Sequence, residues 1–63
     1  MSQIGTAKQV GTNVEVYDEN GYFKFSHTGQ LVGYTSTSVS IKINSNTIYV
    51  YDENGNFKFN QSC

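Results

Sequence analysis

The amino-acid sequence predicts a small all-β fold, an antiparallel meander, sandwich or barrel built from two similar three-stranded units. Residues 16–25 recur as residues 50–59, with nine identities in ten positions. Thr, Tyr, Val, Ile and Phe, which favour strands, dominate the chain, and proline is absent. Turn-forming residues recur between short apolar segments, as in small sandwiches and barrels. Each copy of the repeat therefore predicts one β-hairpin.

The whole chain, residues 1–63, is expected to form a single domain. Its first unit covers about residues 4–26, its second covers about residues 38–60, and residues 27–37 join the two. About seven short strands are expected, at residues 4–10, 14–17, 22–26, 31–34, 38–43, 47–51 and 56–59.

Turn residues set the expected ends of these strands. Gly-Thr-Asn at residues 11–13 ends the first strand, and Asp-Glu-Asn-Gly at residues 18–21 separates the second from the third. His-Thr-Gly-Gln at residues 27–30 forms the next turn, after which residues 31–34 are a strand or a connector. Asn-Ser-Asn at residues 44–46 closes the fifth strand, and the repeated hairpin supplies the last two.

We expect the hairpin turn to be a four-residue Asp-Glu-Asn-Gly loop that pairs Tyr17 with Tyr22. The Asp18 carboxylate can accept backbone N–H groups at the start of the loop. Gly21 permits a positive φ at its end, and the second copy offers the same two residue types. Because a β-branched residue disfavours positive φ, a Gly21→Val substitution is expected to break the hairpin.

Two other turns are compatible with the repeated sequence. A two-residue type I′ turn at Asn-Gly would pair Glu19 with Tyr22. Both this turn and the four-residue loop keep Val16 opposite a Phe. A three-residue loop would place Val16 opposite Lys24 unless a bulge corrected the register.

Alternation along each strand assigns the side chains to two faces. The face expected to form the core carries Val14, Val16, Phe23, Phe25, Val39, Ile41, Ile43, Ile48, Val50, Phe57 and Phe59. The opposite face is expected to carry Glu15, Tyr17, Tyr22, Lys24, Lys42, Tyr49, Tyr51 and Lys58. Aromatic rings among cations are able to hold a base and a phosphate. Cross-strand aromatic pairing or a subunit interface explains the same surface without a ligand.

The connector from Gly33 to Ser38 is rich in hydroxyl groups, which can bond phosphate or ribose oxygens. It lacks the spacing of a phosphate-binding loop and no helix follows it, so an irregular linker or edge strand is the alternative interpretation. The candidate ligand-binding residues are Tyr34, Thr35, Ser36, Thr37 and Lys42, followed by Tyr17, Tyr49 and Tyr51.

The size of the chain favours self-association. A chain of 63 residues buries only about 60% of its unfolded surface and is marginal alone. Its single Cys excludes an intrachain disulfide, and one His and one Cys cannot complete a four-ligand zinc site. A homodimer or higher homo-oligomer is therefore expected. Cys63 is expected to be an incidental free thiol or to form an intermolecular disulfide.

The charge and hydropathy patterns exclude several classes of partner. A formal net charge of −1 argues against general DNA or RNA binding. No apolar run is long enough to cross a bilayer, and the N-terminus lacks the pattern of a signal peptide. A lone thiol without an export signal predicts a cytoplasmic protein.

No residue pattern predicts catalysis, a metal or a cofactor. Asp18-x-Asn20 and its repeat match only the start of a calcium loop and lack the late Glu, so we interpret them as turn caps. His27 is interpreted as a solvated loop histidine, because no nucleophile or orienting carboxylate stands beside it in the sequence. The chain is therefore expected not to be an enzyme.

Two segments resemble short β-repeat proteins encoded by phages and prophages. They are Val-Tyr-Asp-Glu-Asn-Gly and Leu-Val-Gly-Tyr-Thr-Ser-Thr-Ser-Val-Ser-Ile-Lys, and the similarity runs from about Gly5 to Phe59. Several such proteins oppose host defence, some by sequestering nucleotide signals and others by blocking a defence protein. The resemblance implies a counter-defence role in the host cytoplasm and assigns no binding residue.

Three functional hypotheses follow. The first is a non-enzymatic binding protein whose oligomer sequesters a small nucleotide-type ligand, ADP-ribose-like or a cyclic nucleotide, in a cavity or intersubunit groove. The second is a protein–protein inhibitor or adaptor that binds a host protein through an exposed β edge or the tyrosine face. The third is a structural β-repeat module.

Overall fold

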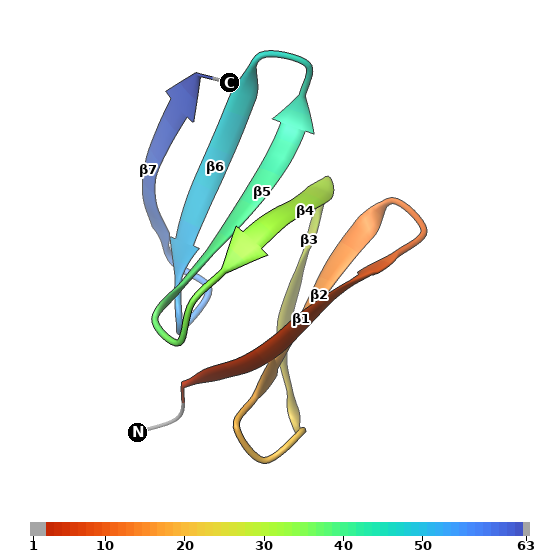
Figure 1. Ribbon diagram of the computed structural model, residues 1–63, viewed down its shortest axis with the longest axis vertical. Helices are drawn as coiled ribbons and strands as arrows, with labels where there is room; N and C mark the ends of the chain where they lie inside the picture. Colours follow the sequence, from red (N-terminus) through yellow and green to blue (C-terminus); the bar gives the residue numbers. More distant parts are fainter. Residues whose placement is uncertain (1–2, 63) are drawn as a thin grey trace.

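The computed structural model describes residues 3–62 and contains seven antiparallel strands in two sheets (Figure 1). The strands are β1 (Ile4–Val10), β2 (Asn13–Asp18), β3 (Phe23–Thr28), β4 (Gln30–Tyr34), β5 (Ser38–Asn44), β6 (Thr47–Asp52) and β7 (Phe57–Ser62). One sheet has the order β1-β2-β3 and the other has the order β4-β5-β6-β7. The predicted all-β class is confirmed, and the two separate sheets exclude a closed barrel.

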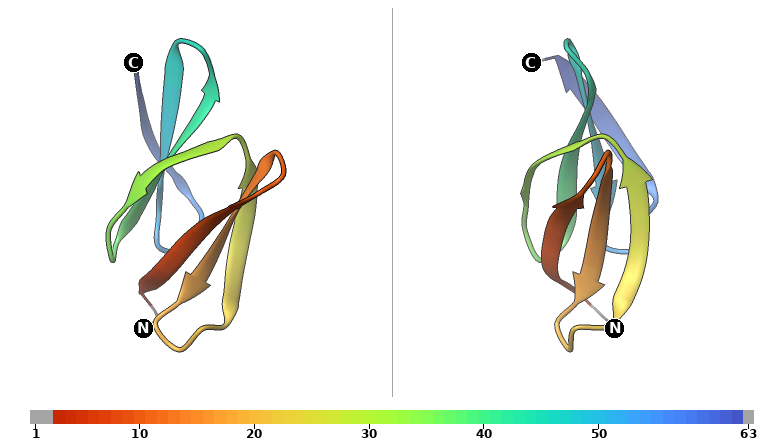
Figure 2. Two further views of the ribbon diagram at one scale, coloured as in Figure 1. Left: turned by 45° about the vertical axis from the view of Figure 1, so that its right-hand side comes forward. Right: turned by 90° about the vertical axis from the view of Figure 1, so that its right-hand side faces the viewer.

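The repeat extends beyond the ten-residue segment to the strands themselves. β5, β6 and β7 each begin and end 34 residues after β1, β2 and β3. The segment expected to be a strand or a connector is the strand β4, which pairs with β5. Figure 2 shows the chain bending from β3 into β4 and so crossing from the first sheet to the second.

The hairpin turn has three loop residues, so the predicted four-residue loop is wrong. Asp18 N donates to Tyr22 O at 2.8 Å, and Gly21 N donates to Asp18 O at 3.1 Å. Gly21 takes a φ of 88° at the end of the loop, as expected for its position. The second copy forms the same turn, with Gly55 at a φ of 87°.

A bulge follows each of these turns and reassigns one phenylalanine of each hairpin. Val16 faces Phe25, whereas Tyr17 faces Phe23, so Lys24 is the extra residue of the bulge. Phe23 therefore shares a face with Tyr17 instead of joining the core, and 58% of its surface is exposed. The second hairpin has the same register shift, which places Phe57 opposite Tyr51 and leaves it 53% exposed.

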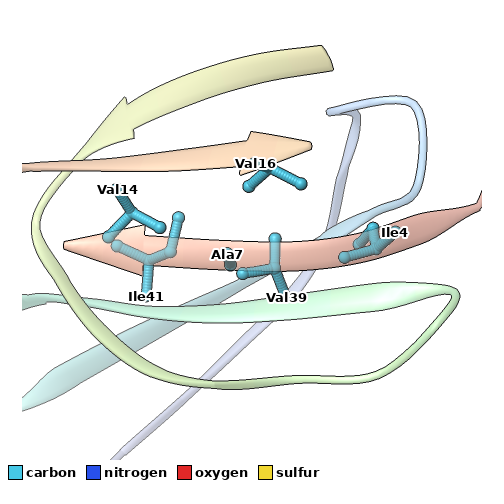
Figure 3. Packing of buried hydrophobic residues seen from close by; sticks show 6 residues of the cluster. All are labelled: Ile4, Ala7, Val14, Val16, Val39 and Ile41. Atoms are coloured by element: carbon cyan, nitrogen blue, oxygen red, sulfur yellow. The ribbon is translucent and has the colours of Figure 1, made fainter. Parts of the chain in front are cut away.

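The observed core lies between β1 and β2 of one sheet and β5 of the other (Figure 3). Its buried residues are Ile4, Ala7, Val14, Val16, Val39 and Ile41, against which Phe25, Leu31 and Tyr51 pack. This core confirms Val14, Val16, Phe25, Val39 and Ile41 as inward-facing residues. Branched aliphatic side chains from both sheets supply most of the buried apolar surface.

The β6–β7 hairpin was predicted to turn Ile48 and Val50 toward the first sheet. The second sheet instead packs against the first with its other face. Ile41 is paired with Tyr49, whereas Ser40 is paired with Val50. Val50 therefore lies on the other side of its sheet from Ile41. Ile48 shares the side of Val50, and both are buried but outside the central cluster. The prediction that they join one face with Ile41 is wrong.

The position of a bulge explains this reversal. The first unit has its register shift between Ile4 and Thr6, at the start of β1. The second unit has it between Lys42 and Asn44, beside the turn, so Ile43 is the extra residue and is 38% exposed. A one-residue slip changes the face of every residue beyond it. Phe59, which faces Val50, is consequently 49% exposed and is also not a core residue.

A single glutamine side chain joins the end of the first sheet to the beginning of β4. Gln9 Nε2 lies 2.9 Å from Gly29 O, and Gln9 Oε1 accepts a hydrogen bond from Leu31 N at 2.7 Å. Gly29 N also donates to Thr12 O at 2.7 Å. These contacts fix the path of the crossover connection, which positions the groove described next.

Candidate binding groove

A groove of about 1020 Å³ lies where the β1–β2 turn, the β3–β4 connection and the β5–β6 turn meet. Gly29, Gln30 and Leu31 contribute from the crossover, and Lys42 and Ile43 contribute from β5. Pockets for small molecules commonly have volumes of about 300 to 1,000 Å³. The groove is therefore large enough for a ligand with several rings or charged groups.

The groove combines an apolar surface with one positive charge. Leu31, Val32 and Ile43 supply branched aliphatic side chains, and Val32 and Ile43 are exposed. Polar groups come from Thr12, Thr28, Gln30, Asn44 and Ser45. Among residues 3–62, Lys42 is the one charged residue that lines the groove. An aliphatic surface can cover the face of a ring, while a lysine ammonium can hold an anionic group.

Of the candidate ligand-binding residues named from the sequence, only Lys42 lines this groove. Residues 34–37 lie at the opposite end of β4 from the groove, where their polar groups form hydrogen bonds with nearby residues. Thr35 Oγ1 lies 3.0 Å from Ser38 Oγ and accepts a hydrogen bond from Thr37 N at 3.3 Å. Ser36 O accepts from Ile4 N at 2.8 Å. The hydroxyl-rich connector therefore forms a turn that satisfies much of its own hydrogen bonding.

Tyr17 lies on the outer face of the first sheet, away from the groove. Its hydroxyl donates to Glu15 Oε1 at 2.7 Å, and this bond to a carboxylate raises the pKa of the phenol. Lys8 Nζ lies 5.2 Å from the centre of the Tyr17 ring, and the Phe23 ring meets it edge-on at 5.8 Å. Tyr34 reaches the same face, with its hydroxyl 3.4 Å from Thr6 Oγ1.

Tyr49 and Tyr51 lie on the inner face of the second sheet instead of the predicted outer face. Tyr51 packs against the core and stacks on His27, with ring centres 3.9 Å apart and planes inclined by 11°. Burial raises the pKa of Tyr51. The Phe57 ring meets Tyr49 at 5.2 Å. Tyr49 and Tyr51 therefore take part in aromatic packing with each other and with Phe57 of the neighbouring strand.

His27 is a half-buried residue of β3, so its interpretation as a solvated loop histidine is wrong. It points inward because it faces Val14 across the β2–β3 pair. Its ring stacks on Tyr51 and contacts Phe25 at 5.4 Å between ring centres. The sequence did not reveal this because β3 continues two residues further than the expected strand.

Asp18 and Asp52 act as caps of the two hairpin turns, as predicted. Asp18 Oδ1 accepts hydrogen bonds from Asn20 N and Tyr22 N, both at 2.8 Å. Asp52 Oδ1 makes the same two bonds at 2.9 Å. Among residues 3–62, His, Cys, Asp and Glu side chains form no group of three or more that could hold a metal ion. Cys63 lies outside the described residues.

The Asp52 cap predicts a loss of stability in acid. The backbone N–H of Asn56 is the main cause of a pKa below the ordinary value of 3.8 for Asp52. A lowered folded pKa means that the cap stabilises the fold above pH 3.8 and loses this effect as the pH falls through the folded pKa. We expect Asp52→Asn to reduce the fall in unfolding free energy across that acidic window. Urea unfolding at a series of pH values measures it, and identical pH profiles for the two proteins would contradict the prediction.

The fold and the groove define a small two-sheet β domain with an open, ligand-sized cleft beside the β1–β2 and β5–β6 turns. Comparison with protein-family models, with curated proteins and with solved structures finds no match to this chain. Between residues 3 and 62 the structure has no helix long and apolar enough to cross a membrane.

Proposed function

We propose that this chain is a non-enzymatic binding protein that holds a small nucleotide-type ligand in the groove beside Lys42. The observation that carries the proposal is the meeting of an apolar surface and a single cation in one ligand-sized groove. A nucleotide offers the complementary pair, a planar ring and an anionic phosphate. The ligand class comprises ADP-ribose-like molecules and cyclic nucleotides.

The composition of the groove favours binding over catalysis. Among residues 3–62, those that line the groove include no His, Cys, Asp or Glu, the residues that most often act as general acids, bases or nucleophiles. Its amides and hydroxyls can bond sugar or base edges, while Lys42 holds the phosphate. The resemblance to phage-encoded β-repeat proteins supports sequestration of a host signalling nucleotide as the use of such binding.

Calorimetric titration with a panel of ADP-ribose derivatives and cyclic nucleotides tests this function. One charge-assisted hydrogen bond contributes about 1.5 to 3 kcal/mol, so Lys42→Gln should weaken binding by about 10- to 100-fold. Lys8→Gln is the matched control, because Lys8 occupies the same repeat position outside the groove. Absence of binding across the panel, or equal weakening in both variants, would contradict the proposal.

A second candidate is an inhibitor or adaptor that binds a protein through the outer face of the first sheet. Phe23 is exposed there, and Tyr17 lies beside it with Lys8 over the Tyr17 ring. Aromatic residues are enriched at protein interfaces. Pull-down of a stoichiometric partner that Phe23→Glu abolishes and Lys42→Gln preserves would favour this candidate over the first.

A further inference from the structure

β7 differs from its repeat counterpart in how much of it is covered. All six residues of β7 are exposed, whereas β3 has three half-buried residues, among them Phe25, which packs against the core. Phe59 occupies the repeat position of Phe25 and has no such cover. The same local sequence is thus packed in one hairpin and bare in the other.

The backbone edge of β7 is also uncovered. β7 is the last strand of its sheet, so within residues 3–62 no strand pairs with its outer side. Its bulge and its charged residue, Lys58, lie at its beginning. Residues 59–62 follow as a regular, uncharged segment without proline. Charges, prolines and bulges are the features that keep edge strands from pairing, and this half of β7 has none of them.

We propose that β7 pairs antiparallel with β7 of a second copy, across a two-fold axis near Asn60. The pairing joins two four-stranded sheets into one sheet of eight strands. A second copy suits this edge because a two-fold contact is self-complementary and closed. It therefore covers the β7 edges of both copies at once.

The size of the core supports this partner. Eight hydrophobic residues are buried among the described residues, and a domain this small commonly gains stability by association. No residue of β7 lines the groove. The inference therefore stands independently of the proposed ligand, and each can fail without the other.

A charge placed at Asn60 tests the pairing without disturbing the core, because Asn60 is an exposed polar residue. Two-fold pairing brings like charges together, so Asn60→Lys and Asn60→Glu should each raise the dissociation constant about fivefold or more. An equimolar mixture of the two variants should recover wild-type association, because opposite charges then meet. Ser26→Lys is the matched control at the same repeat position on β3, and it should associate as the wild type does.

Light scattering from about 1 µM to about 1 mM protein follows the mass, since weak edge pairing dissociates in this range. The expected wild-type result is a rise from the mass of one chain to the mass of two. Hydrogen exchange should show that protection of residues 59–62 rises with concentration, while protection of β6 stays constant in all variants. A wild-type mass of one chain throughout, a mass above two chains, or failure of the mixture to recover association would overturn the proposal.

Discussion

Replacing Ile41 with alanine should lower the free energy of unfolding by about 2 to 5 kcal/mol. Ile41 is fully buried, and it is the largest of the four side chains with no exposed surface. From the second sheet it joins one buried cluster with Val14 and Val16 of the first, so its removal leaves a cavity at the contact between the sheets. A domain of this size is stable by about 3 to 9 kcal/mol, so the loss is a large part of the total. Urea unfolding followed by circular dichroism measures it.

Ile43→Ala is the matched control, with the same change two residues further along β5. The sequence assigns Ile43 to the core face, but the bulge beside the turn leaves it exposed. Its substitution should change the unfolding free energy by only about 0.5 kcal/mol. Equal losses in the two variants would show that the bulge does not separate these residues.

The strands were predictable because their residue types and turns are local features. The repeat identifies both hairpins, and the aspartate caps and positive-φ glycines follow from short-range turn chemistry. The faces were less predictable, because one bulge residue reverses them. Lys24 in the first hairpin and Ile43 in the second unit are such residues, and neither differs in type from an ordinary strand residue.

Lys42 is the one groove-lining residue that the sequence identified as a candidate for ligand binding. The other lining residues lie in or beside three connections that are distant in the sequence and meet where the chain crosses from the first sheet to the second. Val32 and Ile43 become exposed through irregular pairing in β4 and β5, which the apolar pattern does not reveal. The tyrosines were conspicuous in the sequence, yet Tyr51 packs against the core and Tyr49 packs beside it.

Gly29→Ala is expected to lower the free energy of unfolding by about 2 to 4 kcal/mol, through backbone strain and overpacking together. Gly29 has a φ of 143°, which residues with a Cβ rarely adopt. A Cβ at this position would lie 2.5 Å from Ile41 Cγ2 and 2.8 Å from Lys42 O. Ile41 has no free space to yield, and the Lys42 oxygen belongs to the backbone of β5. Thermal and urea unfolding both measure the change.

Gly33→Ala is the matched control for Gly29→Ala, because the loss of stability should be specific to the crossover. Gly33 lies in the same strand as the groove residue Val32, but a Cβ there meets nothing within 4 Å. Its φ is not positive, so alanine fits and restricts the unfolded chain, which should raise stability by about 0.4 to 1 kcal/mol. The two substitutions should therefore shift the unfolding midpoint in opposite directions. A midpoint shift of the same sign in both variants would contradict the prediction. Gly29 would then not be the residue that allows the chain to pass this close to β5 beside the groove.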